Sequence, residues 1–166
     1  LVVQIIIIMK NQSFLILLFF IFLGCQSNTK KSSKIAINIS FQDNVQSKKL
    51  DGRLLLLLSS NQEAEPRFQI GSGLNNQLIF GVNVDGLAPG MKITFDENVF
   101  GYPIESLKDI KPGEYYIQAL LHIYETFNLA SGQTVKLPMD NGEGQKWNKS
   151  PGNLFSKPVK ISITEK

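Results

Sequence analysis

The sequence predicts an all-β protein: an antiparallel β-sandwich of the immunoglobulin or fibronectin-III type. First, the chain from residue 35 onward divides into about seven short apolar segments, separated by turns rich in Gly, Pro, Asn and Asp. Second, several of these segments alternate apolar and polar residues, which is the period of a β-strand. Third, no long amphipathic helix pattern competes, and only residues 104–110 suggest a helical turn.

The alternating segments give the clearest strands. Residues 34–41 ("KIAINISF") place Ile35, Ile37, Ile39 and Phe41 on one face, which predicts a half-buried strand. Further strands are predicted where apolar runs lie between turn signals such as Asp85-Gly86, and these are 67–71, 77–85, 92–96 and 159–164.

The run "LLLLL" within residues 52–60 does not alternate, so its period alone cannot tell a strand from a helix. Its short length and its flanking turn residues favour a strand. Since both faces are apolar, we expect both of them to be buried.

The segment "PGEYYIQA" predicts a corner between two strands. Pro112-Gly113 forms a tight turn, after which residues 114–124 enter the longest strand, with Tyr115 and Ile117 on one face. In immunoglobulin-like sandwiches a tyrosine at such a corner returns its hydroxyl to nearby backbone. The segment resembles the Pro-Gly-x-Tyr strand start of fibronectin-III-like domains.

Residues 1–24 are predicted to be a signal peptide. A short polar segment starting at Met9 precedes an apolar run of ten residues from Phe14 to Leu23. This run is too short for a membrane-spanning helix, which needs about 20 residues. Residues 1–8 precede Met9, so we interpret them as the product of an upstream start and exclude them from the predicted fold.

Cys25 is the only cysteine of the chain and follows this apolar run directly. The arrangement resembles the bacterial lipoprotein signal, in which that cysteine receives a diacylglycerol and becomes the new N-terminus. Phe22 departs from the usual leucine of that motif, and an uncleaved hydrophobic anchor is the alternative. The resemblance implies that Cys25 is acylated and binds membrane lipid, that residues 25–34 are a flexible tether, and that the protein is anchored in the bacterial cell envelope, periplasmic or surface-exposed.

Residues 35–166 are long enough for a single sandwich domain with its own core. The formal net charge of +3 is dispersed, and no basic stripe with interleaved aromatics occurs, so no nucleic-acid partner is expected. A disulfide within the chain is excluded, because there is no second cysteine.

His122 is the only histidine. A role as general base or metal ligand is conceivable, but a zinc site built from several histidines or cysteines is not available. We expect a half-exposed residue of the sheet.

The loop after residue 138 holds the candidate ligand-binding residues. Asp140 and Glu143 lie in "DNGEG", whose oxygens suit calcium; the spacing does not match an EF-hand, and a plain turn is favoured. Trp147 follows in a polar stretch, where it could stack on a sugar or fold over the end of the sandwich. Together with Tyr102, these residues would form a binding face of sandwich loops.

The sequence predicts no catalytic residue, no metal and no cofactor. Gly71-Ser72-Gly73 lacks the Gly-x-Ser-x-Gly pattern of a hydrolase nucleophile, and neither a Walker loop nor a dinucleotide fingerprint occurs. We therefore do not expect the chain to be an enzyme on its own.

Residues 80–159 carry a resemblance to a known group of proteins. The strings "YYIQALLHIYETF" and "KSPGNLFSKPVK" are similar to the N-terminal, non-catalytic region of large secreted bacterial proteins of esterase type. In that group a β-sandwich precedes an α/β-hydrolase domain, so the resemblance implies an accessory or scaffold role. It also implies a hydrolase domain or subunit encoded downstream of Lys166. A stand-alone carbohydrate- or peptide-binding lipoprotein is the alternative, and a self-sufficient hydrolase ranks last.

Overall fold

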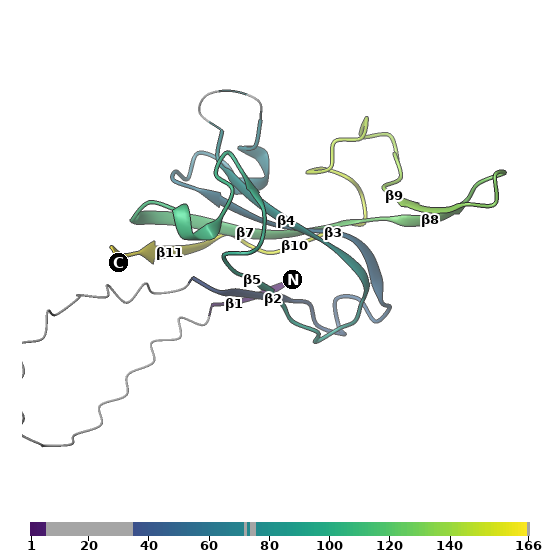
Figure 1. Ribbon diagram of the computed structural model, residues 1–166, viewed down its shortest axis with the longest axis horizontal. Coiled ribbons are helices and arrows are strands. Elements are labelled where there is room, and N and C mark those ends of the chain that lie inside the picture. The colour runs from purple at the N-terminus through teal and green to yellow at the C-terminus, as the bar shows by residue number, and fades with distance from the viewer. Residues whose placement is uncertain (6–34, 72, 74–75, 166) are drawn as a thin grey trace, which may run out of the picture.

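The computed structural model describes residues 1–5, 35–71, 73 and 76–165, and this part of the chain is an antiparallel β-sandwich (Figure 1). The predicted apolar signal run, Cys25 and the tether lie outside the described residues. The strands are β1 (Val2–Ile5), β2 (Ile37–Ser40), β3 (Leu50–Ser59), β4 (Leu78–Leu87), β5 (Ile93–Phe95), β6 (Gly101–Tyr102), β7 (Gly113–Ile123), β8 (Glu125–Asn128), β9 (Thr134–Leu137), β10 (Leu154–Phe155) and β11 (Val159–Ile163).

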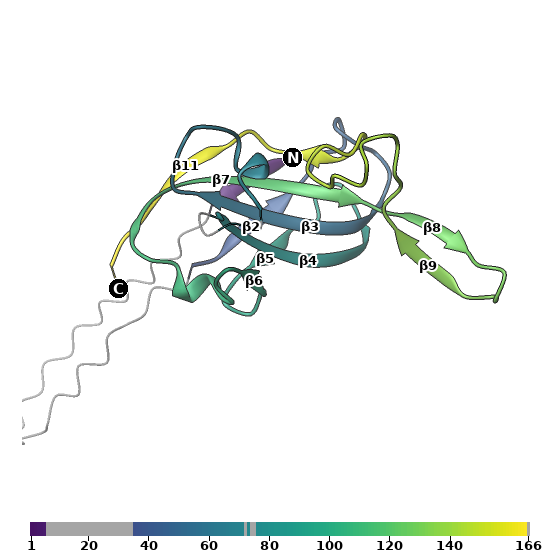
Figure 2. The same cartoon turned by 90° about the horizontal axis from the view of Figure 1, so that it is seen from above.

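These strands form two layers and a separate hairpin. The larger sheet has the order β10-β7-β3-β4-β6, with β11 also paired to β7, and the smaller sheet has the order β1-β2-β5. Strands β8 and β9 pair only with each other and project beyond the two layers, as both views show (Figures 1 and 2). Every strand pair in the described part of the chain is antiparallel.

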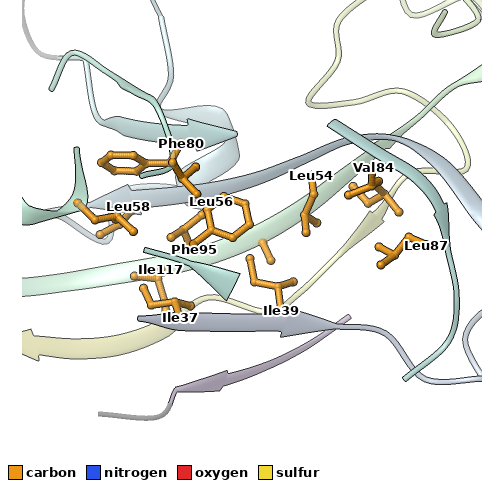
Figure 3. Packing of buried hydrophobic residues seen from close by; sticks show 14 of the residues in the cluster. Ile37, Ile39, Leu54, Leu56, Leu58, Phe80, Val84, Leu87, Phe95 and Ile117 are labelled. Carbon is orange, nitrogen blue, oxygen red and sulfur yellow. The ribbon is translucent and has the colours of Figure 1, made fainter. Parts of the chain in front are cut away.

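The main core lies between the two sheets (Figure 3). Alternation places Ile37 and Ile39 of β2 on the inner side, where they pack with Phe95 of β5. The larger sheet contributes alternate residues of its three central strands, and these include Leu54, Leu56, Leu58, Phe80, Val84, Ile117, Ala119 and Leu121. The sandwich class predicted from alternation is therefore confirmed.

The leucine run of β3 is buried on both faces, as predicted. Leu54, Leu56 and Leu58 belong to the core between the sheets, whereas Leu55 and Leu57 are buried in a second cluster on the outer face. A central strand with neighbours on both sides and cover on both faces needs apolar residues at every position.

The predicted tyrosine corner is also present. The hydroxyl of Tyr115 donates a hydrogen bond of 2.9 Å to the main-chain oxygen of Lys111, just before the turn that starts β7. Ile117, Ala119 and Leu121 follow on the same inward face. The relation to immunoglobulin or fibronectin-III domains in particular stays a prediction.

Two predicted elements differ from the structure. The strand predicted at 67–71 is wrong: Pro66–Phe68 forms a 3-10 turn, because Pro66 fixes the first backbone angle and Gln69 closes the turn on the oxygen of Pro66. Residues 1–8 were excluded from the predicted fold, yet Val2–Ile5 forms a strand beside β2. The predicted helical turn is confirmed as the 3-10 turn Leu107–Asp109.

Within the described residues, no helix has the length and apolar character needed to cross a bilayer.

Candidate functional site

The outer face of the larger sheet holds most of the candidate residues. Its centre is apolar: Leu55, Leu57 and Leu120 are buried there, and Ile70, Ile79 and Trp147 pack against them. Ile79 belongs to β4 of the sheet itself, whereas Ile70 and Trp147 come from two connections, residues 60–71 and 138–153, which form the cover. We call this region the loop-covered face.

Trp147 is part of the cover. Its side chain is partly exposed and packs on the apolar centre. Asn153 donates a 2.7 Å hydrogen bond from Nδ2 to the main-chain oxygen of Trp147, and the neighbouring Asn148 donates one of 3.0 Å to the oxygen of Arg67. The 138–153 connection is thus tied to the first covering connection, and the indole is held against the sheet. Ligand stacking by Trp147 stays a prediction.

His122 lies on β7 beside this cover. The expectation of a half-exposed residue is wrong, since His122 is only 8% exposed. Its ring Nδ1 lies 3.2 Å from Nδ2 and 3.3 Å from Oδ1 of Asn153, and the ring meets Tyr124 edge-on with centroids 5.5 Å apart. On the neighbouring strand its register partner is Arg53.

The pKa of His122 is lowered from its ordinary value of 6.5, mainly because burial disfavours the charged ring. The hydrogen bond with Asn153 and the negative charge of Glu143 act in the opposite direction. The imidazole is consequently held towards its neutral form.

At His122 the backbone of β7 lies very close to Gly52 of β3. A Cβ atom at Gly52 would lie 2.1 Å from the main-chain oxygen of His122, much closer than any real contact. Only glycine allows the two strands to pair here, beside the irregularity between Leu50 and Gly52 in the β3–β4 ladder.

The carboxylates of the "DNGEG" loop make turn hydrogen bonds. Asp140 Oδ1 accepts from the main-chain N–H groups of Gly142 at 2.9 Å and Gly144 at 3.2 Å, and Glu143 Oε2 accepts from Asn141 N–H at 2.8 Å. The pKa of Glu143 is lowered, first by the N–H of its own backbone. Across the described part of the chain, no group of three or more His, Cys, Asp or Glu side chains is placed to hold a metal ion.

Tyr102 lies apart from these residues. It is on edge strand β6, 55% exposed, and paired with Ile79, whereas His122 is on β7, three strands away in the order of the sheet. The structure therefore brings Trp147, Glu143 and His122 to one region through the 138–153 connection. It leaves Tyr102 at the edge of the sheet.

Arg67, Phe68 and Phe155 form an aromatic and cationic cluster near Trp147, and no sequence pattern predicts it. The guanidinium of Arg67 lies 4.4 Å from the ring centre of Phe68 and 3.7 Å from that of Phe155. Its Nε also pairs with Glu65 at 2.9 Å. Both phenylalanines leave a little under half of their surface exposed. Because Phe155 is far from Arg67 in the chain, only the fold reveals the contact.

A polar depression of about 760 Å³ is a second feature that sequence reasoning missed. It lies at the opposite end of β3 from His122, around Ser60 and Tyr115. The described residues that line it are mostly amides and charged groups, together with the apolar Leu78 and Ile104; the polar ones include Asn61, Glu63, Gln69, Asn76, Gln77, Asp109 and Lys111. The Nδ2 atom of Asn76 is buried there without a hydrogen-bond partner.

The β8–β9 hairpin is fixed to the body at its base. Nζ of Lys136 lies 2.8 Å from Asp51 Oδ2 and 2.6 Å from Asp85 Oδ1, which are residues of β3 and β4. The hydrogen bonds to Asp51 and Asp85 raise the pKa of Lys136. In turn, the hydrogen bond from Lys136 is the main cause of the lowered pKa of Asp51. The hairpin exposes Leu129 near its tip and Leu137 at its base, and Met139 is exposed just after β9.

Comparison with known proteins gives no relative. No family model matches the chain, and neither a curated protein nor a solved structure matches it.

Proposed function

We propose that this chain is a non-catalytic accessory module of a lipid-anchored cell-envelope protein, and that it binds and positions an esterase-type catalytic partner. The observation that carries the proposal is the β8–β9 hairpin, which projects from the sandwich (Figure 2). Its side chains include exposed apolar ones. The esterase-type partner comes from the sequence resemblance of residues 80–159.

The hairpin has the properties of a docking element. An isolated two-stranded hairpin is marginally stable in water, so a projecting hairpin with four residues in each strand gains from a partner. Leu129 is 43% and Leu137 is 51% exposed, and Phe127 and Val135 are partly exposed beside them. The double ion pair of Lys136 holds the base of the hairpin in one direction. Exposed apolar groups on a fixed arm suit the apolar centre of a protein interface.

Attachment to the membrane forms the other half of the proposal. Acylation of Cys25 would supply the anchor, and the polar residues 26–34 would give the domain reach from the bilayer. In bacteria fed labelled palmitate, we expect the wild-type chain to carry the label and Cys25→Ser to lose it. An unlabelled wild-type chain would contradict the anchor.

Docking can be tested with a photo-crosslinking residue placed at Leu137 in cells of the source bacterium. Val45 is a matched control, because it is 48% exposed but lies outside the hairpin, in the turn after β2. We expect Leu137 to capture a protein that mass spectrometry identifies as an α/β-hydrolase, and Val45 not to capture it. The same products from both positions, or none from Leu137, would contradict the proposal.

Hydrolysis by this chain alone is the least favoured function. A general base must reach its substrate, whereas His122 is buried beneath the 138–153 connection with its ring against Asn153. The purified chain should give no turnover of a short-chain activated ester above buffer. Turnover that His122→Ala abolishes would reverse this ranking.

Binding of a carbohydrate or peptide is the second candidate, and the polar depression favours it. Amide side chains can hydrogen-bond sugar hydroxyls, and the apolar Leu78 and Ile104 in the same lining can contact the sugar ring. On a glycan array, Asn61→Ala should remove any binding at the depression and Trp147→Ala should leave it unchanged. The reverse result would move the site to the loop-covered face, where Trp147, Asp140 and Glu143 lie.

A further inference from the structure

The outer edge of β2 in this structure is occupied by a strand from the start of the chain. Val2–Ile5 pairs antiparallel with Ile37–Ser40 along the whole length of β2 (Figure 1). Four residues on each strand are in register, from Val2 opposite Ser40 to Ile5 opposite Ile37. The edge of β2 is thus able to receive an extended segment that is remote in the sequence.

The register defines the chemistry that this edge prefers. Ile37 and Ile39 of β2 face the core and are 2% and 1% exposed. Asn38 faces the other side, where its Oδ1 accepts a 2.7 Å hydrogen bond from Thr94 Oγ1 of β5. Cross-strand partners share a face of the sheet. An incoming strand therefore needs apolar residues opposite Ile39 and Ile37 and a polar one opposite Asn38.

The present occupant has this pattern. Val3 and Ile5 are the register partners of Ile39 and Ile37, and Gln4 is the partner of Asn38. The match of apolar, polar and apolar positions explains why this segment selects this register, since a slip of one residue would reverse every position.

The following inference rests on the lipid anchoring proposed above. Cleavage before Cys25 would separate residues 1–24, and with them β1, from the domain. The smaller sheet would then consist of β2 and β5, with four and three residues, and β2 would become an open edge over the core. Open edges present unpaired main-chain N–H and C=O groups and accept added strands.

We propose that the β2 edge is a strand-accepting site, and that in the processed protein it binds an extended apolar-polar-apolar segment of the partner polypeptide, antiparallel to β2. The β1 strand of the full chain fills the place of that segment. The sandwich would thereby complete its smaller sheet with a strand from the molecule that it serves.

The pairing itself is tested first in the full chain, purified in detergent with Cys25→Ser. Gln4→Cys together with Asn38→Cys should form a disulfide on mild oxidation, because register partners place their Cβ atoms about 4.5–5.5 Å apart. Gln4→Cys with Thr126→Cys, on the separate hairpin, is the matched control. Equal crosslinking in both variants, or none in the first, would overturn the site.

Strand exchange is tested next with the same full chain carrying a protease site inserted within residues 26–34. The probe is a fluorescent peptide containing Val-Val-Gln-Ile between lysines, and its binding is followed by anisotropy before and after the cut. We expect at least tenfold tighter binding after the cut, and crosslinking of a peptide cysteine at the glutamine position to Asn38→Cys.

A peptide with lysine at both apolar positions should not bind. Equal binding of the two peptides, or no gain after the cut, would overturn the proposal. If the cut chain forms dimers linked through Asn38→Cys, the β2 edge binds a second copy of this chain, and the proposal that it binds the partner polypeptide is wrong. Palmitate labelling and the hairpin crosslink test the proposed function, whereas the disulfide and peptide assays test the β2 edge. A failure of one proposal is therefore distinguished from a failure of the other.

Discussion

The two faces of the larger sheet are both buried, but by different means. The inner face is closed by the regular strands β2 and β5, whose alternating residues interlock with those of β3, β4 and β7 (Figure 3). The outer face is closed by two irregular connections, with Trp147 as the largest covering side chain. Every apolar position of β3 from Leu54 to Leu58 is buried as a result.

The difference between the two faces shows where a local sequence pattern predicts burial. Strands that cover one face of a sheet alternate apolar and polar residues, so β2 carries a period of two in the sequence, whereas the leucine run of β3 does not. Connections that cover a sheet have no such period, and their contacts depend on single side chains and on hydrogen bonds such as that from Asn153 to Trp147. The loop-covered face is therefore expected to be the softer of the two.

The largest effect should come from adjacent leucines on opposite faces. Leu56 points to the inner core and Leu57 to the loop-covered face, and each is 0% exposed. Replacement of either by alanine should lower the free energy of unfolding by about 2–5 kcal/mol. Leu56→Ala should lie at the upper end, because loops can collapse onto a cavity more readily than a paired strand. Urea unfolding of both variants measures this, and an equal or larger loss for Leu57→Ala would break the comparison.

Removal of the indole should have a smaller effect. Trp147→Ala should reduce the free energy of unfolding by about 1–3 kcal/mol, below the range for a fully buried aromatic, because Trp147 is partly exposed. Trp147→Phe is the control and should recover much of the loss. An unchanged urea midpoint in Trp147→Ala would show that the connection does not depend on its packing.

The buried histidine should make the stability depend on pH. The pKa of His122 is lowered in the folded state by burial, so the unfolded chain binds this proton more readily as the pH falls below about 6.5. The contribution of the neutral ring is present above that pH and decreases progressively below it. Arg53, Tyr124, Asn153 and Glu143 are the groups around the ring.

His122→Gln keeps a polar side chain without this titration. The melting temperature of the wild type should fall more between pH 7 and pH 5 than that of the variant. Parallel curves for the two proteins would show that His122 does not resist protonation in the folded state.

The smallest effect on overall stability is expected at the base of the hairpin. Lys136→Gln removes the ion pairs with Asp51 and Asp85 at the surface, where such pairs contribute little to global stability. Hydrogen exchange of β8 and β9 should become faster, while the urea midpoint of the domain stays unchanged. Thr134→Val is a matched change in the same strand, and it should leave exchange at the base of the hairpin slow. Unchanged exchange in Lys136→Gln would show that the anchor does not fix the hairpin.

The sequence predicted the regular elements well for a physical reason. Ile35 to Phe41 alternates, the leucine run is apolar throughout, and Pro112-Gly113 marks the corner at Tyr115. Prediction failed at 67–71, where "RFQIG" alternates polar and apolar residues but follows Pro66, and Pro66–Phe68 forms a 3-10 turn. The strands β8 and β9 were also missed. The residue between β7 and β8 is Tyr124, and it is not a strand-breaking residue such as Gly or Pro.

The candidate site was predicted less completely than the fold. The sequence singled out His122 by itself, and it grouped Trp147, Asp140 and Glu143 with Tyr102 as one binding face. Their placement depends on the route of the 138–153 connection across β7 and β3. The hydrogen bonds that set this route, from Asn153 and Asn148, join residues with no shared local pattern.

The sequence by itself determined the fold class, the inward face of each alternating strand, and the predictions of a leader and an acylated cysteine. These depend on periods and motifs within about ten neighbouring residues, where sterics and burial act locally. Only the tertiary structure decided the burial of His122, the contact of Arg67 with the ring of Phe155, and the pairing of Val2–Ile5 with β2. Each of these joins segments far apart in the chain, and such contacts form only when the whole sandwich closes around its core.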